Sequence, residues 1–311
     1  MRNDTRRSHG GTSTKDAAGH GQGQRPTASK SRPGRISQKR RSGSRVLTIA
    51  TWVLGLMMVF PFVWMIIQAL QPNDARFAYP PIPDPARFTG DGFATAVGSG
   101  EIITWLRNSS IVALVSTAIS LVAGAGAAYA LARYRGRSVS ASGFLILASQ
   151  MVPPVVVMVP LFSMVTWAGL FDSLTAVILG NVAFTLPVVT WMLSGSFRAI
   201  PIELEEAGMV DGCNRLGVLF RITLPASLPG VAAAAAFSFN WAWQEFLFSR
   251  LVISSGENWV GGMGIASFLG VFDTPWDAVM AATVIFTVAP VLFFLMAQRG
   301  FVNSVGGGLK G

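Results

Sequence analysis

The sequence has few charged residues and very few of the residues that bind metals or form disulfides. Only 13% of its 311 residues are charged, and it contains one cysteine, Cys213, and two histidines, His9 and His20. A single cysteine cannot form an intrachain disulfide, and no metal site is expected. The catalytic patterns H-E-x-x-H and G-x-S-x-G are absent, as is the phosphate-binding loop G-x-x-x-x-G-K-[ST]. These absences argue against an intramembrane enzyme, so no catalytic residue is predicted.

Hydrophobic residues make up 51% of the chain and gather in blocks long enough to cross a membrane. A helix of about 20 apolar residues spans the ~30 Å hydrocarbon core of a bilayer. The sequence therefore predicts an all-α polytopic membrane protein with six transmembrane helices. The predicted spans are residues 46–70, 108–132, 143–165, 174–196, 229–253 and 276–297.

Most of the net positive charge lies in the N-terminal segment. Residues 1–45 carry twelve of the 24 Lys and Arg but only two acids, Asp4 and Asp16. A segment so poor in apolar side chains cannot offset the entropy of ordering, so we predict a disordered basic tail ahead of a transmembrane domain over 46–311. The tail can hold the N-terminus in the cytoplasm or bind anionic membrane lipid. Nucleic acid is not an expected partner, because no aromatic residue is interleaved with these charges.

The basic residues outside the tail orient the predicted spans. They concentrate in the 133–137 and 198–221 loops and at the C-terminus, whereas the opposite side has four arginines. Because cytoplasmic loops carry an excess of Lys and Arg, both termini are predicted to be cytoplasmic. The outer loop 71–107 contains five prolines, which favour an irregular extended lobe that could touch an extracytoplasmic partner.

Small residues and prolines within the spans predict packing contacts and irregular helices. Residues 124–128 read Gly-Ala-Gly-Ala-Ala, which lets helix backbones approach closely in lipid. Pro61 in the first span and three prolines in the third each remove a backbone donor and should bend or break the helix. Such bends suit either a translocation path or simple packing. The prolines of the third span are Pro153, Pro154 and Pro160.

The polar segment 203–230 predicts two short helices that meet at a glycine. Pro201 suits a helix start, and the glutamates that follow it lie in the first turns, where the exposed amides favour negative charge. Gly212 permits a sharp turn, and a second helix is expected over 214–223, ended by Pro225. Its expected apolar stripe is Leu216, Leu219, Phe220 and Ile222. An amphipathic loop lying on the membrane surface would also have such a stripe, but it would not require the glutamates, the glycine break and the prolines.

The spacing of Glu206-Ala207-Gly208, Gly212, Ile222, Leu224-Pro225 and Pro229 resembles the cytoplasmic "EAA" loop of ABC-importer permeases. Gly208 stands where that loop usually has its second alanine. The resemblance extends over 46–311 through segments such as FPFVWMIIQAL, WLRNSSIVA, AYALARYRGR, MVPPVVVMVPLF, GLFDSLTAVIL and SFNWAWQEFLFSRLV. Their order is similar to the carbohydrate branch of the family, which is related to the maltose permease.

This resemblance implies the type I ABC importer permease fold in a bacterial inner membrane, with no cofactor in this chain. ATP and Mg would be bound by a partner ATPase dimer, and the other implied partners are a second, different permease subunit and an extracytoplasmic solute-binding protein. The loop 197–229 would couple to the ATPase. The implied coupling residues are Glu205, Glu206, Ala207, Gly208, Asp211 and Gly212.

Polar and aromatic residues near the end of the predicted fifth span are candidates for the substrate path. Polar groups inside a span are costly and usually face a partner or a cavity. An aromatic face beside amides suits a sugar, although hydrogen bonds between helices would also explain these residues. The helical spacing places Asn240 with Gln244 and Trp241 with Glu245. The candidates are Asn240, Trp241, Trp243, Gln244 and Glu245.

Two other kinds of transporter compete with a sugar importer. A permease of the same architecture could carry a glycerophosphodiester, a polyamine or a peptide. A standalone secondary transporter is less favoured, because it would be expected to show paired broken segments in two homologous halves, and the sequence contains no convincing internal repeat.

Overall fold

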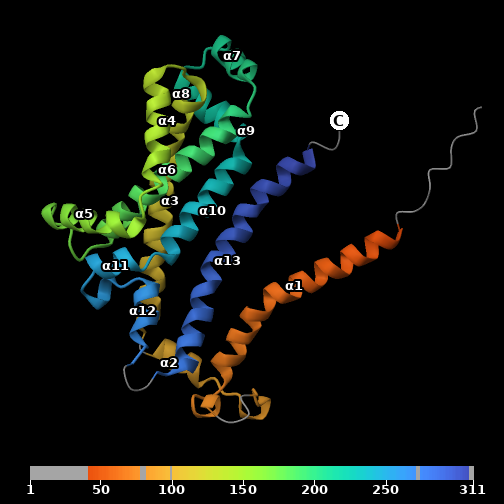
Figure 1. The fold of residues 1–311 in the computed structure, drawn as a ribbon, viewed down its shortest axis with the longest axis vertical. Coiled ribbons are helices and arrows are strands. Elements are labelled where there is room, and N and C mark those ends of the chain that lie inside the picture. The colour runs from red at the N-terminus through yellow and green to blue at the C-terminus, as the bar shows by residue number, and fades with distance from the viewer. Residues whose placement is uncertain (1–40, 78–81, 99, 271–273, 308–311) are drawn as a thin grey trace, which may run out of the picture. The chain divides into compact units, whose positions relative to one another are not determined.

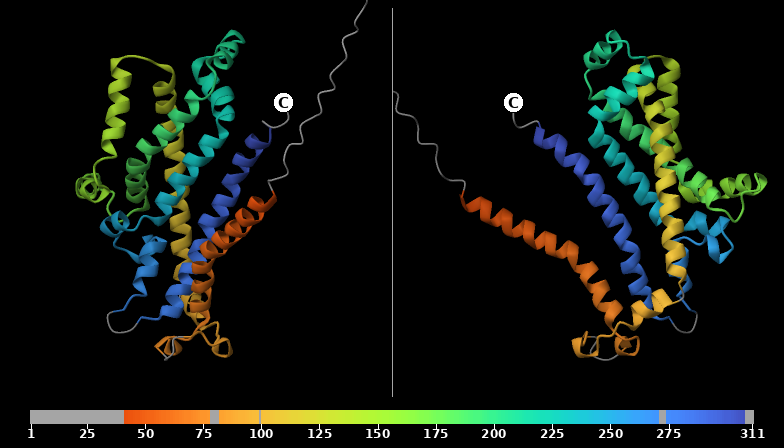
Figure 2. Two further views of the ribbon diagram at one scale, coloured as in Figure 1. Left: turned by 45° about the vertical axis from the view of Figure 1, so that its right-hand side comes forward. Right: turned by 180° about the vertical axis from the view of Figure 1, so that it is seen from behind.

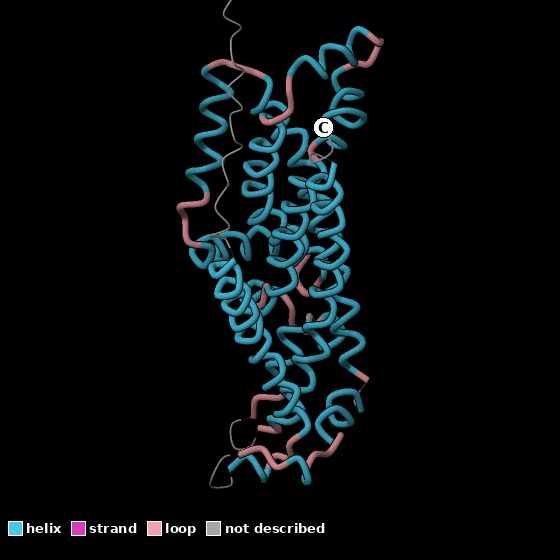
Figure 3. Tube along the Cα trace, turned by 90° about the vertical axis from the view of Figure 1, so that its right-hand side faces the viewer, coloured by secondary structure: helices cyan, strands magenta, loops and turns pink. Residues whose placement is uncertain are grey.

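The computed structural model describes residues 41–77, 82–98, 100–270 and 274–307, with only the helical backbone described at 41–46, 76–77 and 298–307. The predicted disordered tail therefore lies mostly outside the described residues, although helix α1 (Arg41–Leu70) begins within its last five positions. The chain divides into two units, Met1–Leu54 and Gly55–Gly311. The fold described below is that of the second unit. Its described part consists of helices and loops without strands (Figure 3).

Long helices form the centre of this unit. They are α3 (Glu101–Arg133), α6 (Leu174–Arg198), α10 (Leu228–Gln244) and α13 (Trp276–Gly307). Helix α3 starts seven residues before the predicted second span. Helices α3, α6 and α10 run side by side in all views (Figures 1 and 2).

The small residues of α3 let it approach α6 closely, as predicted. A Cβ at Gly124 would lie 2.9 Å from a methyl group of Val189 and 3.4 Å from the hydroxyl of Thr190, so only glycine fits without a shift. A buried hydrogen bond of 2.8 Å joins Ser120 to Thr185 across the same interface. Close backbones with polar pairs are the usual means of helix association in lipid.

The predicted third span is broken and is not one straight helix. Helix α4 (Arg137–Ser149) and helix α5 (Pro154–Trp167) meet at an angle of 101° (Figure 1). Pro153 and Pro154 cause the break, because neither donates a backbone hydrogen bond and the residue before a proline avoids the helical region. In contrast, α1 and α5 continue through Pro61 and Pro160.

The predicted fifth span is also interrupted, at both ends. Before it, α8 (Arg215–Val218), the π-helical turn η3 (Leu219–Thr223) and α9 (Leu224–Ala226) form one segment that meets α10 at 85°. Pro225 therefore does not stop the second loop helix where we predicted. A π-helical turn, η3, precedes it, and the helical segment continues to Ala226.

After α10 the chain turns at Glu245, and the remaining outer elements are short. They are α11 (Leu247–Val252), η4 (Gly256–Asn258) and α12 (Gly261–Ser267). The outer loop 71–107 is more helical than predicted, with η1 (Asp74–Phe77), η2 (Pro85–Arg87) and α2 (Asp91–Gly98). A Cβ at Gly92 would lie 2.7 Å from the carbonyl of Ala69 and 2.8 Å from Asp277, so α2 sits tightly against α13.

By length and composition, four helices can each cross a membrane, and the two bent pairs raise the number to six. Two ends of the unit are distinct (Figure 1). The ends of α3 and α6 lie with α7 (Ile202–Val210) and α8 at one end, and α2 and the start of α13 lie at the other. The arginine-rich loops are thus gathered at a single end, which the charge bias assigns to the cytoplasm.

Candidate functional site

The loop 197–229 folds into two helical segments that meet at Gly212, as predicted, although the second segment runs past the predicted end at Pro225. Helix α7 ends at Val210 with Asp211 as its C-cap, and Gly212 has a φ of 90°, a left-handed conformation that a side chain would strain. Asn214 then caps α8, because its side-chain oxygen accepts a hydrogen bond of 2.7 Å from the amide of Gly217. Gly212 therefore sets the turn between the two helices, as the sequence indicated.

Glu205 is buried at the base of α7 and binds three residues from two other elements, α3 and η3. Its carboxylate accepts two hydrogen bonds from Arg133 at the end of α3, with a closest N–O distance of 2.8 Å. The hydroxyls of Tyr129 and Thr223 donate to it at 3.0 and 2.8 Å. Only 2% of Glu205 is exposed. Its carboxylate is fully occupied within the chain, so it is not free to contact a partner protein directly.

The arginine of this network also fastens the end of α6. One nitrogen of the Arg133 guanidinium donates to the carbonyls of Phe197 and Ile200, at 2.8 and 3.0 Å. These carbonyls lie at and just beyond the C-terminus of α6, where the helix dipole attracts a cation. Arg133 thus joins the ends of α3 and α6 to the first turn of α7.

The environment of Glu205 keeps the carboxyl ionised. Burial alone would raise its pKa, but hydrogen bonds from Arg133, Thr223 and Tyr129 and the charge of Arg133 outweigh burial and lower the pKa below its ordinary value. A buried carboxylate of this kind is stable only with its partners in place. The network therefore makes the position of α7 depend on α3 and η3.

The other predicted coupling residues divide into exposed and buried positions. Glu206, Ala207 and Asp211 are exposed on α7. Gly208 is buried, and a Cβ at this position would overlap the Cδ1 of Ile222. Gly208 therefore lets α7 pack closely on η3 within the loop. We had predicted that it would allow close packing against a partner protein.

Large apolar side chains on the loop face outward. Among the described residues, Val210 is 87% exposed and Leu216 is 66% exposed. Of the predicted stripe, Leu219 is buried and Ile222 is partly buried, whereas Leu216 and Phe220 are exposed. The stripe is thus divided between the packing of the loop and its outer surface. Among the described residues, the exposed large apolar side chains of the loop before α10 are Ile202, Leu204, Met209, Val210, Leu216 and Phe220.

The end of α10 borders a cavity of about 380 Å³. Asn240 and Gln244 are exposed there, and the Gln244 amide donates a hydrogen bond of 2.7 Å to the side-chain oxygen of Asn240. This bond confirms the predicted shared face of the two residues. Because both belong to α10, the bond does not join two helices. Pro154 and Met158 of α5 form the opposite wall of the cavity.

The two tryptophans of this segment have different surroundings. Trp241 lines the cavity and packs against Phe184 and Phe237, with centroid distances of 6.3 Å to each. Trp243 is buried and stacks on Phe286 at 4.5 Å. Trp243 therefore belongs to the packing between α10 and α13, and the structure does not bring it to the cavity with the other candidates.

Glu245 lies at the cavity edge but is not on the helical face predicted for it. Helix α10 ends at Gln244, so Glu245 is in extended backbone. Its carboxylate accepts hydrogen bonds from the amides of Phe248 and Ser249, at 2.6 and 3.0 Å, and from the Ser249 hydroxyl at 2.6 Å. Glu245 thus satisfies the free amides at the start of α11.

The sequence analysis did not single out Tyr129, Arg133 or Thr223, although all three hold Glu205. Tyr129 and Arg133 lie in the segment AYALARYRGR, whose family resemblance was the only available signal. Asp172 was also missed. It has a φ of 60°, and its carboxylate accepts from the amides of Ser254 and Ser255. These hydrogen bonds lower the pKa of Asp172 and tie the turn before α6 to the segment after α11.

Comparison with known proteins gives a consistent set of similarities. The family described as "Binding-protein-dependent transport system inner membrane component" matches residues 120–305. The sulfoquinovosyl glycerol transport system permease protein SmoH of Agrobacterium fabrum is 36% identical over 276 residues, which cover 87% of this chain and 95% of SmoH. The diacetylchitobiose uptake system permease protein DasC of Streptomyces coelicolor is 32% identical over 83% of this chain and 94% of DasC.

A solved structure supports the same fold. It is a crystal structure of a bacterial ABC transporter involved in the import of the acidic polysaccharide alginate, and one of its chains superposes with a TM-score of 0.70. The match covers 85% of this chain and 98% of that chain at 16% sequence identity. At this identity the likeness concerns the fold.

Proposed function

Because this chain belongs to the family of binding-protein-dependent transport system inner membrane components, we propose that it imports a sugar or oligosaccharide as the permease subunit of an ABC importer. The names of SmoH and DasC give sulfoquinovosyl glycerol and diacetylchitobiose as their solutes, which supports this choice. The cavity at the end of α10 is the second support. It presents an aromatic side chain, Trp241, beside the amides of Asn240 and Gln244.

The chemistry of this cavity suits a carbohydrate. The amide groups of Asn240 and Gln244 can donate and accept hydrogen bonds with hydroxyls, and an indole face packs against the apolar face of a sugar ring. The alternative role for the pair, gluing two helices together, receives no support from their mutual bond within α10. Asn240 and Gln244 are therefore proposed as solute-contacting residues.

The loop 197–229 is proposed to dock on a separate ATPase, which would bind and hydrolyse ATP with Mg. The observation that carries this proposal is the exposed surface of α7 and α8, where Glu206 lies among large apolar side chains. A patch of large exposed apolar side chains is typical of a surface that another protein covers. The Glu205 network would transmit the movement, because it ties α7 to the ends of α3 and α6.

Co-purification with the ATPase tests the docking proposal. Replacing Glu206 by Lys should weaken ATPase association by at least about tenfold, since a like charge would meet the arginine or lysine that an acidic anchor implies. Gly212→Val should also weaken it, because a β-branched residue is strained at a φ of 90°. Glu257→Lys is a matched charge reversal at the other end of the unit and should leave association unchanged. Retention of both association and stimulated hydrolysis in the first two variants would refute the docking proposal.

The solute is tested separately, through the solute-binding protein of the proposed importer. Calorimetry of that protein should give a sugar or oligosaccharide as its ligand, and the same ligand should be taken up by proteoliposomes containing the complete importer. In the Asn240→Leu and Gln244→Leu variants, uptake should fall while assembly with the ATPase is kept. A glycerophosphodiester, polyamine or peptide ligand would refute the sugar assignment and leave the docking proposal intact.

A further inference from the structure

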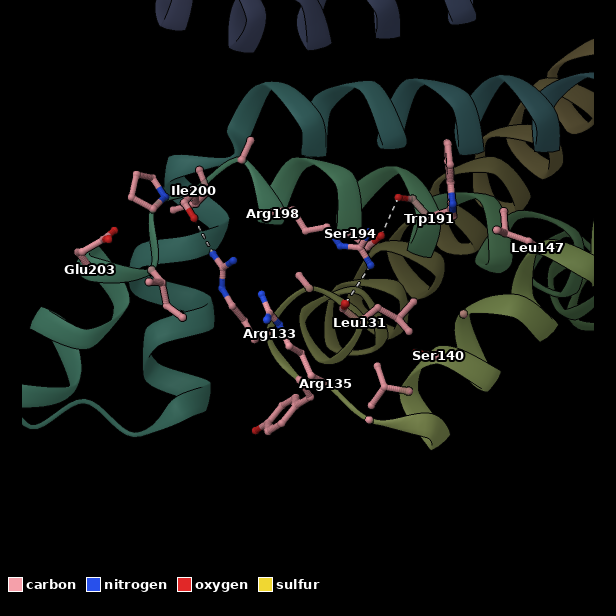
Figure 4. Close-up of a pocket in the computed structure, with 18 residues that line it drawn as sticks. Leu131, Arg133, Arg135, Ser140, Leu147, Trp191, Ser194, Arg198, Ile200 and Glu203 are labelled. Atoms are coloured by element: carbon pink, nitrogen blue, oxygen red, sulfur yellow. Dashed lines mark hydrogen bonds between the residues drawn. The ribbon is translucent and has the colours of Figure 1, made fainter. Parts of the chain in front are cut away.

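A groove of about 1010 Å³ opens between α4, the ends of α3 and α6, and the start of α7. Figure 4 shows it with Arg133, Arg135 and Arg198 near the helix ends and with Leu147 and Trp191 farther along α4 and α6. It lies outside the proposed coupling surface of Glu206 and outside the cavity at the end of α10. It is at the end of the unit that the charge bias assigns to the cytoplasm.

The lining of the groove changes from basic to apolar along its length. Its α4 wall is formed by Val139, Gly143 and Leu147, which lie one helical turn apart on one face. This wall is roughly 12 Å long at 1.5 Å per residue. On α6, Trp191 lies roughly 10 Å from Arg198 by the same rise. A groove with cations at one end and apolar side chains at the other, here called the apolar trough, can bind an amphiphile with an anionic headgroup.

Two arginines at the basic end are available to an anion. Arg133 is already neutralised by Glu205, but Arg135 and Arg198 are exposed. Arg198 donates from one nitrogen to the carbonyl of Leu131 at 3.1 Å, which orients its guanidinium and leaves other donors free. A planar guanidinium group can donate two hydrogen bonds to two oxygens of one phosphate. Glu203 is the one acid that lines the groove.

The apolar end of the groove has exposed side chains. Trp191 is 55% exposed and Leu147 is 46% exposed, and Gly143 between them contributes no side chain. A Cβ at Gly143 would make an ordinary contact of 3.5 Å with Leu131, so packing does not require a glycine at this position. The missing side chain leaves the groove wider there. The trough can therefore receive an acyl chain.

We propose that this groove binds one anionic phospholipid from the cytoplasmic leaflet. The phosphate lies between Arg135 and Arg198, and an acyl chain lies along Gly143, Leu147 and Trp191. Basic pockets between transmembrane helices on the cytoplasmic side are a recurring form of anionic headgroup site. The basic N-terminal segment is a poor occupant, because its twelve Lys and Arg would face two more arginines. A lipid held here bridges α4, α6 and the start of α7.

The test is native mass spectrometry of the assembled importer after exchange with vesicles of phosphatidylglycerol and phosphatidylcholine. The wild type should retain phosphatidylglycerol selectively. The Arg135→Gln/Arg198→Gln variant should bind it roughly thirtyfold more weakly, because two favourable charges are lost. Arg221→Gln removes an exposed charge from the same end of the unit, outside the groove, and should retain the lipid as the wild type does.

A second variant separates a lipid site from an anion site. Gly143→Leu keeps every charge but fills the trough, so it should also reduce retention of phosphatidylglycerol. If only the double arginine variant loses the lipid and soluble glycerol 3-phosphate competes with it, the groove binds a free phosphate group and the proposal is wrong. The proposal is also wrong if the wild-type importer retains no phosphatidylglycerol, which is the result expected when a partner subunit covers the groove. It is wrong as well if both groove variants retain the lipid like the wild type.

Discussion

The cytoplasmic loop and the α10–α11 junction each hold a shielded glutamate, and the two carboxylates have different kinds of partners. Glu205 binds Thr223, Arg133 and Tyr129, which are 18, 72 and 76 residues away in the sequence. Glu245 binds Phe248 and Ser249, which are three and four residues away. The first glutamate therefore joins distant elements, and the second stabilises the start of a single short helix. Loss of Glu205 should damage the fold more than loss of Glu245.

The largest effect is expected for Glu205→Ala. Removing the carboxylate leaves the Arg133 guanidinium buried without its counter-ion, which typically costs about 3–5 kcal/mol. The free energy of unfolding should fall by this amount, and thermal unfolding of the purified permease measures the loss. Glu206→Ala is the matched control, because Glu206 is the exposed neighbour on the same helix and should change stability by less than about 0.5 kcal/mol. Equal losses in the two variants would show that the Glu205 network does not hold α7.

A smaller effect is expected for Glu245→Ala. The variant loses the acceptor for two amides at the start of α11, and loss of such a cap costs about 0.5–2 kcal/mol. Ser249→Ala removes the hydroxyl contact but keeps the amide contacts, so it should cost less. The same unfolding measurement applies. A loss as large as that of Glu205→Ala would mean that Glu245 has distant partners as well.

The same two regions explain which features could be predicted from the sequence. The turn at Gly212 and the start of α7 depend on local conformation, and both were predicted from residue type and spacing. The burial of Glu205 depends on Arg133, 72 residues earlier, and no periodicity in the loop indicates that contact. The sequence could therefore place the loop between its helices without showing which of its glutamates is exposed.

The interruptions of the predicted spans likewise depend partly on contacts that the sequence does not reveal. Pro153 and Pro154 predicted a bend in the third span, but its angle of 101° depends on how α4 and α5 pack. At Glu245 the sequence continues as a run of polar and aromatic residues without a glycine or proline, so we predicted an uninterrupted helix. The carboxylate instead caps α11, which is a choice between two local hydrogen-bonding patterns that composition does not decide.

The contribution of Glu205 should depend on pH. Its pKa in the folded protein is lowered. In the unfolded chain a glutamate has a pKa of about 4.3. The stabilisation is therefore fully present above the unfolded pKa and is lost as the pH falls through the folded pKa. The stability gap between the wild type and Glu205→Gln should be widest near neutral pH and should shrink in acid. Unfolding temperatures of both proteins across this range measure it, and a gap independent of pH would contradict an ionised Glu205.

The smallest effect is expected at Gly208, where the loop packs most closely. An added Cβ in Gly208→Ala would overlap only Cδ1 of Ile222, the flexible end of that side chain. Helix propensity favours alanine by about 0.8–1 kcal/mol, so the cost of moving Ile222 should be largely offset and the net change should stay below about 1 kcal/mol.

The double variant Gly208→Ala/Ile222→Val separates these two contributions. Valine lacks the overlapping methyl group, so the double variant should be more stable than the sum of the single changes predicts, as a double-mutant cycle measures. Additive single effects would mean that α7 moves as a whole to admit the methyl group. In that case the Glu205 network would be the weaker constraint on α7, because a shift of the helix would have to stretch the hydrogen bonds to Arg133 and Thr223.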